Sequence, residues 1–214
     1  MTRESTLSPK QKSIGPIAAY AAIGDMKRLH LALDHGLDAG LSVSDCKEIL
    51  VQLYAYAGFP RSLNALAQMM RVLEERKQRG VADIPGREPA PVPVGAELLA
   101  VGTANQTKLS GQPVKGALFE FAPAIDQYLK AHLFGDIFAR DNLDWTSREL
   151  ATIAALSAMT GVESQLQAHV RIGMNVSLTA LQLSEFGTGL AAGGDADAAK
   201  RLDAALDATR SAKP

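Results

Sequence analysis

Glu149 and His169 are the two side chains of this sequence best suited to proton transfer. They lie on two consecutive segments of helical periodicity, which a turn at residues 160–161 joins. Since an antiparallel helix pair returns the chain to its starting level, a residue of the second helix can meet one of the first. A carboxylate that accepts a hydrogen bond from histidine fixes the ring tautomer and raises its basicity. The pair therefore indicates general acid–base chemistry.

Simpler interpretations of the same two residues stay open at this stage. Glu149 is also the fourth residue of the stretch Thr146-Ser147-Arg148-Glu149, which has the pattern of a helix capping box. His169 could be an ordinary, partly buried helix residue. If Glu149 pointed to solvent as a capping residue, far from His169, the catalytic hypothesis would fail.

The stretch 54–66, YAYAGFPRSLNAL, gathers aromatic residues in a chain that is only 5% aromatic. Tyr54, Tyr56 and Phe59 could form one wall of a pocket, or they could be core residues. The Gly-Phe-Pro sequence within the stretch predicts a break between helices, because proline is excluded from a helix interior. Arg61 could bind a carboxylate through its planar guanidinium group, or it could solvate a helix start.

The chain is predicted to be all-α, because apolar residues recur at helical spacing and no convincing strand alternation appears. Capping boxes at Ser8, Ser42 and Thr179 each begin a helix. The predicted helices cover approximately residues 9–23, 26–35, 42–59, 63–77, 122–133, 146–158, 165–174, 179–192 and 197–208.

A Pro- and Gly-rich linker is predicted at residues 81–120, because its first part holds four prolines, which favour extended backbone. It separates a first unit, residues 1–80, from a second, residues 121–214. Both units contain a helix, a Gly-containing turn, a second helix and a cap. One constant offset pairs Gly24 with Gly161, Leu29 with Leu166 and Leu41 with Leu178. The chain is therefore predicted to be internally duplicated.

Composition argues against several classes of function. A net charge of −1 over 214 residues provides no basic field for nucleic acid. No apolar run approaches the ~18 residues of a membrane span, and Met1–Gln11 lacks the apolar middle of a signal peptide. The cytoplasm is the expected location. A single cysteine, Cys46, cannot form an internal disulfide, and His30 and His35 are not spaced as ligands of a metal ion.

The stretch 54–66 closely resembles the signature of the carboxymuconolactone decarboxylase family, whose fold is shared with the AhpD-type alkylhydroperoxidases. Residues 121–145 are similar to the connecting region of two-repeat members. The resemblance implies an all-α, AhpD-like helical bundle and no cofactor or metal. Because single-repeat members assemble as hexamers, it also implies a homo-oligomer, a trimer of two-repeat chains.

The dithiol of the AhpD-type proteins is missing. In those proteins a Glu/His pair relays protons to a Cys-x-x-Cys motif just before the histidine, where this chain has Val162 and Gln165. Dithiol peroxidase chemistry is therefore not expected. The separation between Glu149 and His169 is one residue longer than in the family, and the additional residue is expected in the turn at 159–161.

The two repeats have lost complementary parts of the family pattern. The first repeat has Ser13 and Ala32 at the Glu and His positions, but it keeps the aromatic stretch 54–66. The second repeat keeps the Glu/His pair, and a Gly-rich sequence at 187–194 replaces the aromatic stretch. We therefore expect one composite site per chain, with residues from both halves.

The resemblance implies a cofactor-independent carboxy-lyase that acts on a small carboxylated lactone or related ring compound. His169, oriented by Glu149, is the expected general acid. The expected substrate-binding residues are Tyr54, Tyr56, Phe59, Arg61, Trp145, Arg148 and Arg171. Two alternatives stay open: a non-catalytic or ligand-binding homologue, and a peroxiredoxin-type, alkylhydroperoxidase-like redox protein that uses Cys46.

Overall fold

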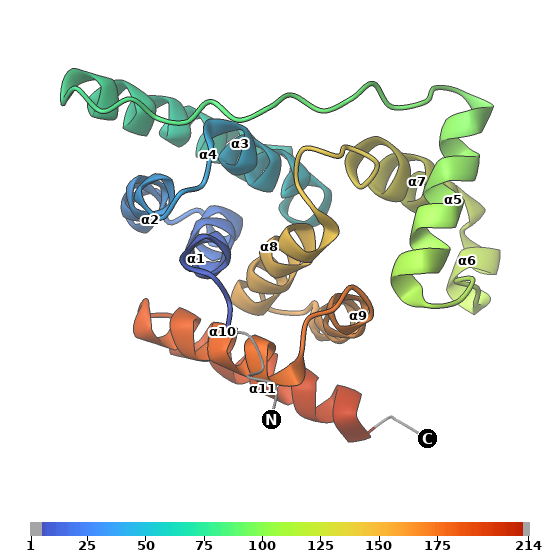
Figure 1. The fold of residues 1–214 in the computed structure, drawn as a ribbon. Helices are drawn as coiled ribbons and strands as arrows, with labels where there is room; N and C mark the ends of the chain where they lie inside the picture. The colour runs from blue at the N-terminus through green and yellow to red at the C-terminus, as the bar shows by residue number, and fades with distance from the viewer. Residues whose placement is uncertain (1–5, 212–214) are drawn as a thin grey trace.

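A computed structural model of the chain describes residues 6–211, and every regular element among them is helical. Helices α1 (Pro9–Ile23) and α8 (Trp145–Ala158) pack side by side at the centre of the bundle (Figure 1). The predicted all-α fold is confirmed. The sequence-based expectations for residues 1–5 and 212–214 lie outside the described residues.

The first hairpin consists of α1 and α2 (Met26–Asp38), and α3 (Val43–Gln52) follows it. Predicted to end near His35, α2 instead continues through Gly36. A Cβ on Gly36 would lie 2.8 Å from a methyl carbon of Ile17, so this glycine permits close packing of α2 on α1 and does not end the helix.

Helix α4 (Tyr54–Gln78) carries the aromatic stretch and bends within it. The bend lies at Gly58, whose φ of 80° and ψ of 161° are non-helical. The bend lies within the Gly-Phe-Pro sequence that predicted a break, and Pro60 is accommodated in the first turn after it. A proline fits there because the amide it lacks has no helical partner in a first turn.

Extended backbone at residues 81–94 runs along the outside of the bundle towards α5 (Figure 1). The amides of Val43 and Ser44 donate to the carbonyls of Ile84 and Pro85, at 2.8 and 3.0 Å, so this segment caps α3. The predicted linker holds only in this first part of residues 81–120.

Two helices follow within the predicted linker, α5 (Ala96–Ser110) and α6 (Ala117–Phe121). Helix α5 packs against a π-helix, η1 (Leu129–Ile137), that continues α7 (Pro123–Tyr128). Gly102 allows this contact, because a Cβ there would lie 1.7 Å from a backbone oxygen of η1. A small second core forms between these elements, with Leu109, Leu133, Phe134, Ile137, Phe138 and Ile172.

The second hairpin consists of α8 and α9 (Glu163–Asn175). Helices α10 (Ala180–Ala192) and α11 (Ala196–Ser211) pack against each other, and together they cover one side of both hairpins (Figure 1). Within residues 6–211, no helix combines the length and apolar character that a membrane span requires.

The two hairpins share local backbone geometry at equivalent positions. Gly24 and Gly161 both have positive φ, 75° and 79°, and Gly40 and Ser177 do as well, at 96° and 84°. The Leu41 amide donates to the Gly36 carbonyl at 3.0 Å, as the Leu178 amide does to that of Gly173 at 2.9 Å. These parallels agree with an internal duplication; the boundaries at 80 and 121 stay a prediction.

Candidate functional site

The Glu149 and His169 side chains meet between α8 and α9. The His169 Nδ1 and Glu149 Oε2 atoms lie 2.8 Å apart, and the residues are 8% and 0% exposed. The capping-box interpretation of Glu149 is wrong. Asp144 caps α8 by accepting from the Ser147 amide at 2.9 Å, and the Glu149 side chain is free to face α9.

The turn between α8 and α9 is where the additional residue between Glu149 and His169 is expected. Helix α8 ends at Ala158, and Met159 follows with extended backbone, at φ −87° and ψ 157°. Gly161 then adopts positive φ before α9 begins. An additional residue in this turn would lie outside both helices and would not rotate either of them by the ~100° that one inserted helical residue causes.

The contact between Glu149 and His169 determines which ring nitrogen is available. With Nδ1 held by the carboxylate, Nε2 is the nitrogen that can exchange a proton with a ligand. The second carboxylate oxygen, Glu149 Oε1, is buried and has no hydrogen-bond partner within residues 6–211. The geometry is therefore that of an imidazole oriented by a buried carboxylate.

Tyr56 brings the aromatic stretch of the first repeat to this pair. Its ring lies edge-on to the His169 ring, with centroids 5.4 Å apart and planes at 81°. Burial, together with the nearby Glu149 carboxylate, raises the pKa of Tyr56 above its ordinary value. The phenol is therefore neutral at physiological pH, and contact between the two halves, expected for a composite site, is present.

Tyr54 and Phe59 contact each other and not the His169 ring. Their rings stack at a centroid distance of 4.4 Å, and the Tyr54 ring also lies 5.5 Å from that of His132 on η1. Phe59 is 62% exposed. Of the three aromatic residues that the sequence proposed for a pocket wall, only Tyr56 has a ring contact with the His169 side chain.

Arg148 is not available to hold a substrate carboxylate. It is fully buried, its Nη2 lies 2.9 Å from Glu48 Oε2, and the same atom donates to the Arg140 carbonyl. Burial lowers the pKa of Arg148 below its ordinary value. The neighbouring Glu48 carboxylate acts in the opposite direction but does not outweigh burial. The sequence-based assignment of Arg148 to substrate binding is therefore corrected, because the charge of this guanidinium is already paired.

Neither Arg61 nor Trp145 has a hydrogen bond or ion pair to the Glu149–His169 pair within residues 6–211. The Arg61 guanidinium packs so closely on Gly24, at the turn between α1 and α2, that a Cβ there would lie 1.6 Å from it. Trp145 donates from Nε1 to the Phe138 carbonyl at 2.9 Å and packs against the second core.

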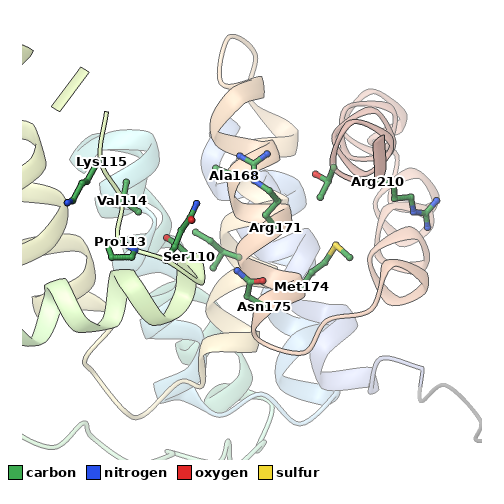
Figure 2. Close-up of a pocket in the computed structure, with 12 residues that line it drawn as sticks. Ser110, Pro113, Val114, Lys115, Ala168, Arg171, Met174, Asn175 and Arg210 are labelled. Atoms are coloured by element: carbon green, nitrogen blue, oxygen red, sulfur yellow. The ribbon is translucent and has the colours of Figure 1, made fainter. Parts of the chain in front are cut away.

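Arg171 is exposed on α9, two positions after His169. It lines a cleft between α9, α11 and the segment that follows α5 (Figure 2). His169 is not among the residues that line this cleft. Of the three arginines proposed to bind a carboxylate, Arg171 is the one nearest to His169 in sequence. It is also exposed.

A buried polar network beneath α8 was not identified from the sequence. Glu48 accepts from both Arg148 and Arg140, and Gln52 donates from Nε2 to the Arg148 carbonyl and to Thr152 Oγ1, each at 2.8 Å. Burial alone would raise the pKa of Glu48, but these arginines lower it below its ordinary value. One feature of the sequence could have indicated this network: Glu48 and Gln52 are polar residues one helical turn apart, next to the apolar residues of α3.

The thiol of Cys46 is buried and poorly suited to redox chemistry. Its exposure is 0%, and burial is the main cause that raises its pKa to about 12. Since the thiolate is the reactive form, this geometry argues against the peroxiredoxin-type alternative. Within residues 6–211, no group of three or more His, Cys, Asp or Glu side chains is arranged to hold a metal ion.

A family model described as the carboxymuconolactone decarboxylase family matches residues 1–69 and 123–208. The first matched segment contains the aromatic stretch, and the second contains Glu149 and His169. The segment between them, which includes α5, lies outside the match. The comparison with curated proteins found no match.

Proposed function

Because the chain belongs to the carboxymuconolactone decarboxylase family, we propose that it is a cofactor-independent carboxy-lyase for a small carboxylated lactone or related ring compound. The observation that supports this proposal most directly is the buried hydrogen bond of 2.8 Å between Glu149 and His169. The edge-on Tyr56 ring and the apolar core around α8 add a wall that limits access of water.

The reaction requires one proton to be delivered to carbon. Cleavage of the bond to the carboxylate releases CO₂ and leaves the bonding electrons in a conjugated enolate. His169 then donates a proton from Nε2 to the carbanionic carbon, and the neutral ring takes up another proton from solvent. Glu149 stabilises the imidazolium form that precedes the transfer, as a buried carboxylate does for a catalytic histidine.

Arg171 is our candidate for holding the substrate carboxylate. It is exposed and has no ion pair within residues 6–211, and, two positions after His169, it projects from a different side of α9 than the ring. Arg61, near the turn between α1 and α2, is the second candidate. An arginine suits this role because its guanidinium group can donate two parallel hydrogen bonds to one carboxylate.

The test is turnover of a panel of carboxylated lactones, followed by CO₂ release. We expect His169→Asn to lower kcat by about 10²-fold or more, the range of general acid catalysis. Glu149→Gln should lower it less, since the imidazole remains. The exposed His35→Asn, in the first hairpin, is the matched control and should leave kcat unchanged. Wild-type kcat in His169→Asn would contradict the proposal.

A second candidate is a ligand-binding homologue without turnover. The engagement of Arg148 by Glu48 supports it, since this arginine cannot contribute to substrate binding. In this case the same lactones would raise the melting temperature by mass action, as RT ln(1 + [L]/Kd) predicts, and no CO₂ would be released. The two measurements on one panel separate the candidates.

We also propose that the protein is a cytoplasmic homo-oligomer, and specifically a trimer. Large exposed apolar side chains support association of copies, since monomers rarely expose many of them: Phe59 is 62%, Met70 is 72% and Phe121 is 88% exposed. Light scattering should give three times the chain mass of 22.7 kDa. A monomer at micromolar concentration would contradict the proposal.

A further inference from the structure

A cleft with a volume of about 700 Å³ opens between three segments of the chain. Its walls come from α9, from the end of α11 and from residues 110–115, which join α5 to α6 (Figure 2). The size is typical of small-molecule sites.

Three cations line the cleft, one from each segment. Figure 2 shows Lys115 on one side, Arg210 on the other and Arg171 between them. None of the lining residues is acidic. Within residues 6–211, Lys115 and Arg171 have no ion pair, and Arg210 reaches only the exposed Asp207, at 4.0 Å. Apart from this one long, exposed pair, no carboxylate within residues 6–211 forms an ion pair with the three cations, so the cleft has an excess of positive charge.

The wall formed by residues 110–115 is held in place against α9. Asn175 Nδ2 donates to the Leu109 carbonyl at the end of α5, at 3.0 Å. At Gly111 the chain turns with a φ of 78°, and a Cβ there would lie 3.3 Å from the Asn175 amide. A cleft whose walls are fixed beforehand loses less conformational entropy when a ligand binds.

Helix ends explain only part of the positive charge. Arg210 lies in the last turn of α11, where a cation is favoured by the partial negative charge of unpaired carbonyls. Lys115 lies beyond the end of α5, and Arg171 precedes the last turn of α9, so their positions need another explanation. The apolar side chains of Val114 and Ile172 also line the cleft and could contact an organic ligand.

Most of this cleft lies outside the family pattern. Residues 110–115 fall between the two segments that match the family model, and Arg210 follows the second of them. Two of the three cations are therefore features of this chain that family membership does not assign. An anion site built from them would be specific to this protein or its close relatives.

We propose that this cleft binds a small organic anion that carries at least two carboxylate or phosphate groups on an apolar body. Lys115 and Arg210 would contact anionic groups at the two sides, Arg171 would contact them in the middle, and Val114 and Ile172 would contact the apolar part. The proposal concerns equilibrium binding, so it holds whether or not His169 turns over a substrate.

Calorimetric titration with benzene-1,3,5-tricarboxylate tests the proposal. We expect binding that weakens with salt, and an increase in Kd of about tenfold for each of Lys115→Met and Arg171→Met, the loss of one charge-assisted contact. Lys47→Met, which removes an exposed lysine on α3, is the matched control and should leave Kd unchanged. Benzene-1,3-dicarboxylate and inorganic phosphate should separate carboxylate from phosphate preference.

Three outcomes would overturn the proposal: no binding of any of these anions at low salt, equal affinity in wild type and Lys115→Met, or an equal loss in Lys47→Met. Lys115→Met guards against unfolding as an explanation, because this exposed residue lies outside every helix. His169→Asn should keep its affinity for the tricarboxylate while losing CO₂ release. Absence of anion binding in the cleft and absence of the proposed decarboxylation are therefore distinguishable.

Discussion

The hairpins α1–α2 and α8–α9 have the same backbone plan and differ in what their equivalent side chains do. In the second hairpin, His169 and Glu149 form a buried hydrogen bond. In the first, Ala32 occupies the histidine position and is buried as part of the core. One copy of a duplicated unit can thus become purely structural while the other keeps polar groups suited to chemistry.

Asp25 and Arg28 are the first-repeat equivalents of Val162 and Gln165, the positions of the missing dithiol, and they too have structural roles. In the first hairpin, Asp25 caps α2 and pairs with Arg28 at 2.6 Å, and Arg28 lies over the Tyr20 ring. The Tyr20 hydroxyl donates to the Gly193 carbonyl at 2.5 Å, and a Cβ on Gly193 would lie 2.8 Å from this hydroxyl. Close packing against Tyr20 of α1 therefore explains why residue 193 is a glycine. It lies in the Gly-rich sequence 187–194, which replaces the aromatic stretch in the second repeat.

The largest expected effect on the free energy of unfolding comes from removing the buried ion pair between the two repeats. Arg148→Met removes the more deeply buried of the two arginines that Glu48 of the first repeat pairs with in the second, at 2.9 Å, and leaves Arg140 as the remaining partner. Since Arg140 still pairs with Glu48, we expect unfolding by urea to show a loss of about 1.5–3 kcal/mol, typical of a lost hydrogen bond to a charged group. The exposed pair of Arg87 and Asp141 provides a control, since Arg87→Met should cost less than about 1 kcal/mol. A loss of similar size in both variants would mean that the buried pair does not couple the halves.

A smaller effect is expected from acid, and it should originate in the first repeat. The pKa of the buried Glu48 is below its ordinary value of 4.5, so its ionised form stabilises the folded state. This stabilisation is complete above about pH 4.5 and is lost as the pH falls towards the folded-state pKa. Glu48→Gln should flatten the fall in unfolding free energy below about pH 4.5.

Glu163 in the second repeat is the control for the acid prediction. Its pKa is also lowered, chiefly by hydrogen bonds from backbone amides, but the side chain is exposed. Glu163→Gln should therefore leave the acid slope nearly unchanged. The same flattening in both variants would contradict the assignment of acid sensitivity to the buried carboxylate.

The smallest effects test whether Gly40 and Ser177 are equivalent. Both have positive φ, and a Cβ on Gly40 would meet no atom within 4 Å, so only backbone strain should matter there. Gly40→Ser should destabilise the protein by about 1 kcal/mol, and Ser177→Gly should stabilise it by less than that. Thermal unfolding measures both. Shifts of the same sign would show that the two turns are not equivalent.

Helix positions and the duplication could be predicted because they depend on local patterns. Ser42 and Thr179 begin helices through their own side chains, and glycines allow positive φ wherever they stand. Helix α5 was missed because prolines in the first part of its segment obscured the helical pattern that follows. The Gly-Phe-Pro sequence predicted a break correctly, and the structure places the bend at Gly58, since proline is tolerated in a first helical turn.

The sequence by itself determined the helical fold, the duplication, the loss of the dithiol and the identity of the Glu149–His169 pair. Only the tertiary structure decided that Asp144, and not Thr146, caps α8, and that Arg148 is already paired with Glu48. It also decided that Lys115, Arg171 and Arg210 share one cleft. The physical reason is that a capping or helical pattern acts within a few residues, whereas the partner of a charge is set by packing between segments distant in sequence.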